Sequence, residues 1–335
     1  MRRIVTSDWQ LTDNPRDRYR TDFVVDALPE LVNKYKVDQL IIAGDLTEEK
    51  DAHPAPLVNE IVYCFNNLSQ VCEIIILQGN HDFLHNAHPF FEFLSCFDNI
   101  KWISKPTILD NCLFLPHTRD YKKDWANVDL KADYDFVFAH NIFTGVNAAN
   151  GHALSGIPPT IFPKDAMVIS GDVHEPQIVN ENIVYVGSPL LCDFGDDYQP
   201  RVLLLDDLKV KSIKVYGQQK RLISVIWKNN APNGGEDTYF DIGKASEGDI
   251  VKINVHIEMK HVSEWATIRQ QIEDWAIQNK FVVNSIIPVV AYERGKRQQI
   301  VNGSSKSDNE YLDAFVKRLG VDEQIAQVGK ELMGD

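Results

Sequence analysis

Short apolar runs that end in a polar cluster recur along the first two thirds of this 335-residue chain. Runs of about four to six residues rich in Val, Ile, Leu and Phe predict buried strands. Between them, apolar residues repeat every three or four positions at 22–36, 56–68 and 87–97, which predicts helices. The expected strands span residues 3–6, 39–43, 73–77, 112–115, 135–139 and 166–170, followed by 183–186, 202–205 and 212–215.

The pattern changes after residues 229–237, where Asn, Gly and Pro are abundant and a linker is expected. The segments 12–20 and 141–163 are expected to be loops. The fold class is therefore α/β, or α+β, with a larger domain at 1–225 and a smaller α+β domain at 226–335. In the second domain we predict strands at 250–257 and 281–290, a helix at 262–278, and amphipathic helices at 311–319 and 323–332.

The composition narrows the classes of function. The chain is 44% hydrophobic, enough for a sizeable core, and contains no apolar run of membrane-spanning length. Its N-terminus leads directly into a polar motif, unlike a secretory signal peptide. Five cysteines without Cys-x-x-Cys spacing favour reduced thiols in a cytoplasm, the host cytoplasm if the chain is viral. A net charge of −14 argues against a passive nucleic-acid coat, but not against an enzyme whose bound cations meet phosphates.

Five polar clusters, at residues 7–10, 44–48, 79–82, 139–141 and 171–174, directly follow predicted strands. Polar groups at the end of a buried strand are costly unless they are paired or bind a ligand. Together the clusters supply carboxylates, imidazoles and amides. Two divalent metal ions held by such groups clamp the attacking and leaving oxygens when a phosphoester is hydrolysed. The sequence therefore predicts a two-metal site.

Each cluster has an expected role in that site. Asp45 can bridge the two metals. His81 stands beside a ligand and is free to act as a general acid toward the leaving oxygen. The other expected ligands are Asp8 on one metal and Asn80 and His140 on the other, with Asp172 and His174 closing the two coordination spheres.

The motifs resemble those of the calcineurin-like metallophosphoesterases, which read Asp-x-His, Gly-Asp, Gly-Asn-His-Asp/Glu, His and Gly-His-x-His. Within that superfamily the chain looks most like DNA-repair nucleases of the meiotic-recombination-11 and SbcD type. Its layout is similar to that of the T-even phage recombination endonuclease subunit. Thr6-Ser7-Asp8-Trp9 is like the SbcD opening Ser-Asp-Trp-His, and residues 185–190 are like the family's Tyr-x-Gly-Ser-Pro turn.

This resemblance implies a four-layer sandwich of two mixed β-sheets flanked by helices, followed by a small DNA-capping domain. It implies double-strand exonuclease and single-strand endonuclease activity, a homodimeric core and a complex with an SbcC-type ABC ATPase. Two family histidines are replaced by oxygen donors, which favours Mn²⁺, or Mg²⁺, over Zn²⁺. The implied ligands are Asp8, Gln10, Asp45 and His174 for the first metal and Asp45, Asn80, His140 and Asp172 for the second, with Gln10 and Asp172 in place of the histidines.

Candidate substrate-binding residues lie beside these motifs. For the arginines an ordinary solvated position is an equally good interpretation, and for His117 a supporting role behind the ligands. Two other functions fit the same motifs: a phosphoesterase acting on small molecules or phosphoproteins, and a non-enzymatic scaffold with a weakened metal site. The candidates are Arg16, Arg18, Arg20, His117 and Ser188.

Overall fold

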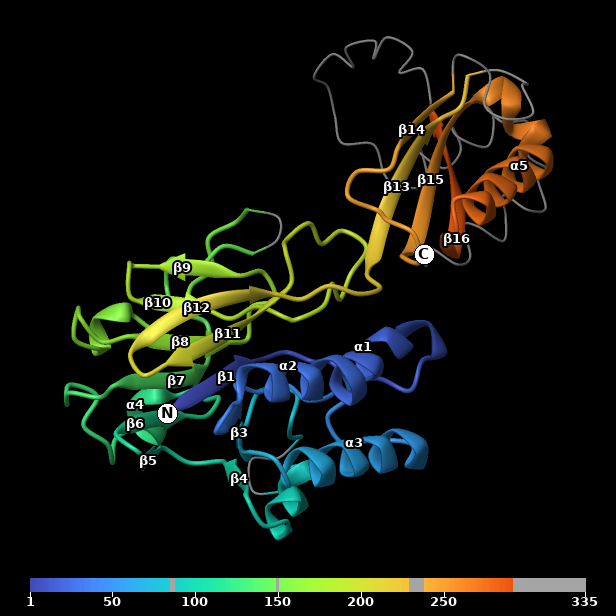
Figure 1. The fold of residues 1–335 in the computed structure, drawn as a ribbon. Coiled ribbons are helices and arrows are strands. Elements are labelled where there is room, and N and C mark those ends of the chain that lie inside the picture. The colour runs from blue at the N-terminus through green and yellow to red at the C-terminus, as the bar shows by residue number, and fades with distance from the viewer. Residues whose placement is uncertain (85–87, 149–150, 229–237, 292–335) are drawn as a thin grey trace, which may run out of the picture. The chain divides into compact units, whose positions relative to one another are not determined.

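Two six-stranded mixed sheets form the larger part of the protein in a computed structural model, which describes residues 1–84, 88–148, 151–228 and 238–291 (Figure 1). The two predicted helices at 311–319 and 323–332 lie outside these ranges. Within the described ranges, no helix has the length and apolar character needed to cross a membrane.

The first sheet has the strand order β12-β11-β1-β2-β3-β4. Its strands β1 to β4 run parallel, whereas β11 and β12 are antiparallel additions beside β1. The carboxyl ends of the parallel strands therefore meet at one edge. The strands are β1 (Arg2–Thr6), β2 (Gln39–Ile42), β3 (Glu73–Leu77), β4 (Ile100–Ile103), β11 (Arg201–Asp206) and β12 (Lys209–Lys214).

The second sheet has the order β5-β6-β7-β8-β10-β9. Its central strands β6, β7, β8 and β10 are parallel, and β5 and β9 close the two edges as antiparallel strands. The strands are β5 (Thr107–Leu109), β6 (Cys112–Leu115), β7 (Phe136–His140), β8 (Val168–Gly171), β9 (Gln177–Val179) and β10 (Ile183–Tyr185).

Alternation along the strands divides the core into layers. In β1, Ile4 packs with the helices of the first sheet, and the next residue, Val5, packs between the two sheets. Ile74 and Ile75 of β3 divide in the same way, because neighbouring side chains on a strand point to opposite faces. This explains why residues 4–5 of β1 and 74–77 of β3 are apolar at consecutive positions: both faces are covered.

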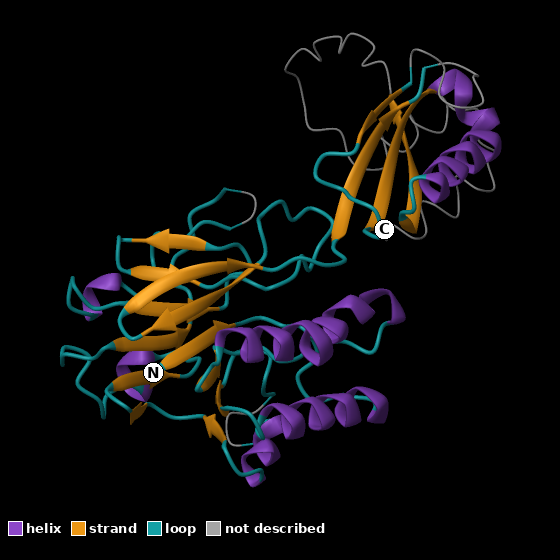
Figure 2. Ribbon diagram, viewed as in Figure 1, coloured by secondary structure: helices purple, strands orange, loops and turns teal. Residues whose placement is uncertain are grey.

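Helices lie together beside the first sheet, as Figure 2 shows, while the second sheet is accompanied by short helical turns. The helical stretch α1, a π-helical segment (Phe23–Ala27) and α2 is continuous along the chain. The helices are α1 (Arg18–Asp22), α2 (Leu28–Tyr35), α3 (Ala55–Leu68) and α4 (Tyr121–Asp124), with 3₁₀ turns at Pro15–Asp17, Phe90–Cys96 and Pro159–Ile161.

A third, four-stranded sheet has the order β14-β13-β15-β16. Its helix α5 (Trp265–Gln278), which follows a 3₁₀ turn (Met259–Glu264), repeats Ile268, Ile272 and Ala276 every four residues, and these pack on the sheet. The strands are β13 (Lys220–Ile226), β14 (Tyr239–Asp241), β15 (Ile250–Glu258) and β16 (Val282–Ala291).

Strand pairing favours a domain boundary in the connection between β12 and β13. β13 precedes the linker-like residues 229–237, yet it pairs in parallel with β15 over its full length, from Lys220↔Ile250 to Ile226↔His256. A boundary after residue 225 would cut this strand from its sheet. We therefore propose that the first domain ends within 215–219.

The predicted class of two mixed sheets is confirmed, and the nine strands predicted in the first domain are all present. Eight of them agree within two residues at both ends, while the strand predicted at 212–215 begins three residues earlier, at Lys209. The loop predicted at 12–20 is wrong at its end, because α1 begins at Arg18 after a 3₁₀ turn that the Asn14 side chain caps. The helix predicted at 87–97 is a 3₁₀ turn starting at Phe90. The strands β4, β5, β9, β13 and β14 were not predicted.

Candidate metal centre

Left-handed turns follow β1, β2 and β8. Asp8, Gln10, Asp45 and Asp172 have φ of 54°, 49°, 59° and 77°, a region that residues other than glycine seldom occupy. Strain of this kind costs about 1–3 kcal/mol per residue and is retained where the surroundings over-determine it, often at functional sites. The turns place these polar side chains at the edge where the parallel strands end.

Asp8, Asp45 and His140 form the centre of the cluster. Each offers one ligand atom, these atoms lie within 4.8 Å of one another, and all three residues are buried. The Nδ1 of His140 lies 2.5 Å from the carbonyl oxygen of Ala43, so Nδ1 carries the hydrogen. Its Nε2 consequently faces Asp45 Oδ1 at 3.4 Å and Asp172 Oδ1 at 3.8 Å, with a proton when the imidazole is charged and with a lone pair when it is neutral.

The amide of Asn80 meets three acceptors at the same place. Its oxygen lies 2.9 Å from His140 Nε2. With the amide turned over, its nitrogen would donate to His140 Nε2 at 2.9 Å and to Asp45 Oδ2 and Asp172 Oδ1 at 3.3 Å. Four side chains thus converge on one point with lone pairs. Either an N–H group or a cation is needed to satisfy them, and the unturned amide adds its own oxygen as a further acceptor for a cation.

Gln10 lies on the side of the cluster that also contains Asp8 and Asp45. Its Nε2 donates to Asp45 Oδ2 at 3.0 Å, while its Oε1 is buried without a hydrogen-bond partner. A buried polar atom with no partner is costly, unless it accepts from something else, such as a cation. The main chain of Asp172 joins this side of the site, because its N–H donates to Asp8 Oδ1 at 3.2 Å.

Burial and neighbouring charges shift the pKa values of the carboxylates and of His140, and these shifts show that the cluster lacks positive charge. Burial raises the pKa of Asp8, and that of Asp172 to about 6, because an ionised carboxylate loses hydration there. Burial alone would lower the pKa of His140, but Asp45 and the other carboxylates hold it well above its ordinary value. Burial would raise the pKa of Asp45, and the charge of His140 overcomes this and lowers it. A divalent cation would relieve the same imbalance more completely.

Asp82 holds the cluster together without being a predicted ligand. Its carboxylate accepts from the main-chain N–H groups of Gly79 at 2.6 Å and of Asp45 and Leu46 at 2.9 Å each. It is 1% exposed. The sequence placed Asp82 in the motif of residues 79–82, but gave it no role, because bonds to a neighbouring strand's turn are not visible in a motif.

Close approach of the main chain explains one glycine of the motif. A Cβ at Gly79 would lie 2.2 Å from Asp45 Oδ1 and 2.6 Å from Asp45 N. Real Cβ atoms do not approach other atoms so closely, so only glycine lets β3 end against the Asp45 turn.

His81 has one ring nitrogen fixed and one left for chemistry. Its Nδ1 lies 2.6 Å from the carbonyl oxygen of Glu48, so Nδ1 carries a hydrogen. Its main-chain N–H donates to Asp45 Oδ1 at 2.9 Å, which places the residue directly beside the cluster. His174 belongs to the same neighbourhood, since its charge acts on the carboxyl of Asp8.

His117 lies behind His140. Its Nδ1 is 3.3 Å from the His140 carbonyl oxygen, and the two rings meet edge to face with centroids 6.2 Å apart. Burial and the charge of His140 lower the pKa of His117 to about 4, so the ring is neutral at ordinary pH. The structure therefore places it in a supporting position at the rim of the site.

Two of the expected substrate-binding residues are buried instead. Arg20 is 3% exposed, and its guanidinium donates to the carbonyl oxygens of Gln10 at 2.6 Å and Cys192 at 3.0 Å. Ser188 is 0% exposed and donates to the carbonyl oxygen of Asp8 at 2.9 Å. The prediction of direct substrate contact is corrected for both, because their polar atoms fix the turns that carry Asp8 and Gln10.

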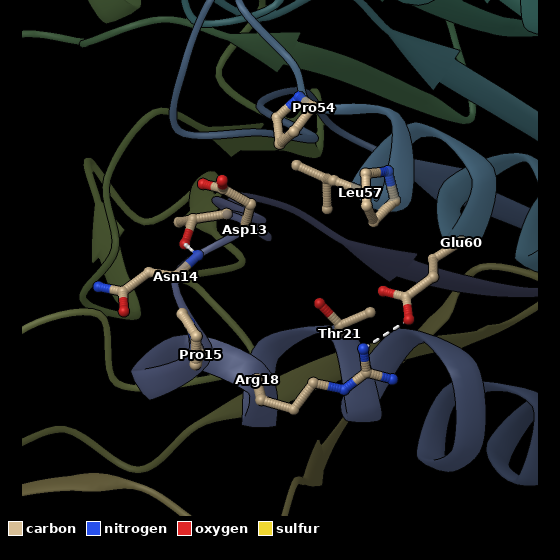
Figure 3. Close-up of a pocket in the computed structure, with 10 residues that line it drawn as sticks. Asp13, Asn14, Pro15, Arg18, Thr21, Pro54, Leu57 and Glu60 are labelled. Carbon is tan, nitrogen blue, oxygen red and sulfur yellow. Dashed lines mark hydrogen bonds and ion pairs between the residues drawn. The ribbon is translucent and has the colours of Figure 1, made fainter.

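The other two arginines are on the surface. Figure 3 shows Arg18 turned toward Glu60 of α3, with its Nη1 2.5 Å from the carboxylate, in the lining of a cavity of about 370 Å³. Arg18 also pairs with Asp22 at 2.8 Å. Two carboxylates thus already neutralise this guanidinium. Arg16 is exposed and stays a candidate for phosphate contact.

Comparison with known families identifies the class. A family described as calcineurin-like phosphoesterase matches residues 1–213, and the chain belongs to this family. The resemblance inferred from the motifs is thereby confirmed, and with it a phosphoesterase with an α/β fold. Membership of this family implies divalent metal ions, for which Asp8, Asp45 and His140 form a possible binding triad. The site fits such ions, because Gln10 Oε1 is unpartnered and the acceptors around Asn80 converge.

Relatives are distant. Putative phosphoesterase 078R of invertebrate iridescent virus 3 is 25% identical over 195 residues, 52% of this chain and 54% of that protein. Putative phosphoesterase 244L of invertebrate iridescent virus 6 is 24% identical over 211 residues, 55% of this chain and 68% of that protein. The SbcD component of the nuclease SbcCD of Escherichia coli (strain K12) is 25% identical over 251 residues, 58% of this chain and 62% of that protein. The match thus spans about half the length of 078R.

Among solved structures, the Pseudomonas putida nuclease MPE is similar, with a TM-score of 0.36 and 14% identity, over 63% of this chain and 87% of that chain.

Proposed function

We propose that this phosphoesterase hydrolyses phosphodiester bonds in DNA with two divalent metal ions. The observation that carries the proposal is the meeting of lone pairs from Asn80, His140, Asp45 and Asp172 beside Asp8. Bound ions supply positive charge to the phosphate and to the leaving oxygen. The likeness to a component of a bacterial nuclease over 251 residues supports DNA as the substrate.

The proposed ligands divide into two sets that share Asp45. Carboxylate and amide oxygens predominate over imidazole nitrogens in both sets, which favours Mn²⁺, or Mg²⁺, over Zn²⁺. We infer that the set containing Gln10 is the looser one, since an amide oxygen is a weak donor. The first set is Asp8, Gln10, Asp45 and His174, and the second is Asp45, Asn80, His140 and Asp172.

His81 is the proposed general acid. Because Nδ1 is held by the Glu48 carbonyl, the imidazolium form would present its second proton on Nε2. When water adds to phosphorus and the bond to the leaving oxygen breaks, that oxygen takes up a proton, and Nε2 is the atom of His81 that can give it. The contact between His81 N–H and Asp45 Oδ1 keeps the ring beside the cluster.

A second candidate function is hydrolysis of small-molecule or phosphoprotein esters. It is supported by the likeness to two viral putative phosphoesterases. The homodimer and the ABC ATPase partner implied by the SbcD resemblance are further proposals. The helices at 311–319 and 323–332, the expected docking segment, lie outside the described residues.

The decisive assay compares linear duplex DNA, circular single-stranded DNA and bis(p-nitrophenyl) phosphate, each with Mn²⁺, Mg²⁺, Zn²⁺ or chelator. We expect DNA cleavage with Mn²⁺ or Mg²⁺, little with Zn²⁺ and none with chelator. Asp45→Asn serves as the inactive control, because it weakens the bridging position. Hydrolysis of the small diester without cleavage of either DNA would favour the second candidate. Failure to bind any divalent metal at millimolar concentration would favour the scaffold.

A further inference from the structure

Two cavities flank the metal centre on opposite sides of His140. The order β6-β7-β8 in the second sheet fixes the sides: His117 follows β6, His140 ends β7, and His174 follows β8. A cavity of about 640 Å³ has His117 and Gln78 in its lining. A cavity of about 440 Å³ has Asp172 and His174 in its lining. Both volumes fall in the range of ligand pockets, about 300–1,000 Å³.

The first, here called the lysine cavity, offers cations without partners. Lys105 and Lys123 line it and are exposed, and no ion pair within 4.0 Å engages either lysine in the described parts of the chain. Of its two carboxylates, Asp124 already accepts from Thr118 Oγ1 at 2.5 Å, and the other is Glu92. Trp125 also lines this cavity, and its buried Nε1 has no hydrogen-bond partner.

The second, here called the acidic cavity, has the opposite character. Lysine and arginine are absent from its described lining, and its carboxylates include Glu175, Asp193 and Asp197 beyond the proposed ligands. Asp196 is there too, with its Oδ2 accepting from the main-chain N–H groups of Cys192 and Asp193 at 2.9 Å each. Lys244 neutralises part of this charge through its 2.8 Å ion pair with Asp197.

A nucleic-acid strand carries one negative charge at every phosphate, so it cannot cross both cavities at equal cost. Unlike charges attract it along Lys105 and Lys123. Like charges at Glu175, Asp193 and Asp196 repel any phosphate placed beyond the scissile one. Bound metal ions would neutralise the scissile phosphate itself, but they would leave the charge of the carboxylates beyond the proposed ligands Asp172 and His174 in place.

We propose that the strand leaves the metal centre through the lysine cavity, and that the acidic cavity accepts one terminal nucleoside with a free hydroxyl and disfavours a terminal phosphate. The proposal rests on the proposed DNA phosphodiesterase function and adds its end specificity. Water would add to the scissile phosphorus while its bond to the oxygen of the terminal nucleoside breaks. The nucleoside would leave with a protonated hydroxyl, the phosphate would stay on the strand, and a phosphate on the terminal end would protect the strand.

The direct test uses the full chain with Mn²⁺ and three thymidine dinucleotides: one with hydroxyls at both ends, one with a 5′-phosphate and one with a 3′-phosphate. We expect one of the two phosphates, and only one, to lower kcat/KM at least about tenfold, because it must enter the acidic cavity. Equal rates for all three dinucleotides, or equal losses with both phosphates, would overturn the proposal.

Charge-neutral variants assign the effect to the cavity. In Glu175→Gln/Asp193→Asn the ratio of kcat/KM between the hydroxyl and the protected dinucleotide should fall toward one. Asp26→Asn/Glu30→Gln, which removes two charges from exposed positions along the helical stretch from α1 to α2, is the matched control and should keep the ratio. An unchanged ratio in the first variant would overturn the role of the acidic cavity.

Binding provides a readout independent of turnover. With chelator present, the affinity for a fluorescent 12-nucleotide single strand is measured by anisotropy at several salt concentrations. Each phosphate contact contributes about 0.7 to the slope of log affinity against log salt, so Lys105→Ala/Lys123→Ala should reduce the slope by about 1.4. Lys209→Ala/Lys211→Ala on β12 is the matched control. Equal slopes for the two variants would contradict the proposal that the strand passes through the lysine cavity.

The proposed DNA function and the proposed end specificity would be contradicted by different results. If bis(p-nitrophenyl) phosphate is hydrolysed and no dinucleotide or DNA is, the proposed DNA function fails and the end specificity fails with it. If dinucleotides are hydrolysed irrespective of their end groups, the DNA function stands and the end specificity alone is overturned.

Discussion

At the scale of single residues, Asp82 decides where a proposed ligand stands although it is not one itself. Its two oxygens accept three main-chain N–H groups, those of Gly79, Asp45 and Leu46. Asp82→Asn replaces one acceptor oxygen by an NH₂ group that faces N–H donors. We expect about 1–3 kcal/mol less stability in urea unfolding, as for a buried polar group left unsatisfied, and weaker Mn²⁺ binding. Asp26→Asn, an exposed carboxylate, is the control; equal stability of the two variants would contradict the anchoring role.

Gly79→Ala tests the close packing of the β3 turn against Asp45. The added Cβ would meet Asp45 Oδ1 at 2.2 Å, so Asp45 must shift. We expect at least about a tenfold loss of Mn²⁺ affinity in calorimetry, by analogy with disturbed support of metal ligands. Gly195→Ala is the matched control, because a Cβ there meets no heavy atom within 4 Å. Metal binding retained in Gly79→Ala would show that the turn can relax.

His81→Ala separates chemistry from binding. If His81 protonates the leaving oxygen, its loss should lower kcat by about 10²–10⁴-fold while Mn²⁺ and DNA binding persist. His88→Ala, an exposed histidine seven residues further on, should behave like the unaltered chain. Near-normal cleavage by His81→Ala would remove this residue from the mechanism.

The sequence was informative about which residues the structure brings together and less informative about their contacts. Strand-end motifs pointed to Asp8, Asp45 and His140, because a buried polar residue is costly unless it is paired or binds a ligand. They misplaced Arg20 and Ser188, since nothing local shows that an arginine in a charged segment will be buried against main-chain carbonyls 10 and 172 positions away.

At the scale of elements, the strands that are buried on both faces were the most readily predicted from the sequence. β2 and β3 are covered on both faces and read as continuous apolar runs. β13 escaped prediction because it contains Lys220, Arg221 and Ser224, and because its parallel partner β15 comes after residues 229–237. β5 and β9 are three-residue edge strands, too short to show a period.

The proposed domain boundary leads to a prediction about truncation. A chain ending at residue 217 keeps both six-stranded sheets whole and removes all of β13. We expect it to fold and to hydrolyse bis(p-nitrophenyl) phosphate, while cleavage of duplex DNA falls sharply, because the second domain is the expected capping domain. A chain ending at 226, which keeps β13 without its partner β15, is the comparison and should be less soluble. Undiminished DNA cleavage by the 217-residue chain would refute the capping role.

At the scale of the whole molecule, the reactivity of the five cysteine thiols tests which parts of the chain are buried. All are free, and only Cys96 is exposed. Burial raises the pKa of Cys64 to about 12 and of Cys72 to about 11, so their reactive thiolate is scarce at neutral pH. Iodoacetamide should label Cys96 alone in the native protein and all five cysteines in urea, as measured by mass spectrometry. Rapid native labelling of Cys64 would contradict this packing.

The two six-stranded sheets contribute different halves of the metal centre: Asp8 and Asp45 come from the first, His140 and Asp172 from the second. The bond from Asp172 N–H to Asp8 spans 164 positions of sequence. Because the proposed ligands come from both sheets, we expect the complete set to form only after the two sheets have docked. Stabilisation that is absent from the folding transition state slows unfolding and leaves the folding rate unchanged. In stopped-flow experiments, Mn²⁺ should therefore slow unfolding, and so lengthen the lifetime of the native state, without changing the folding rate.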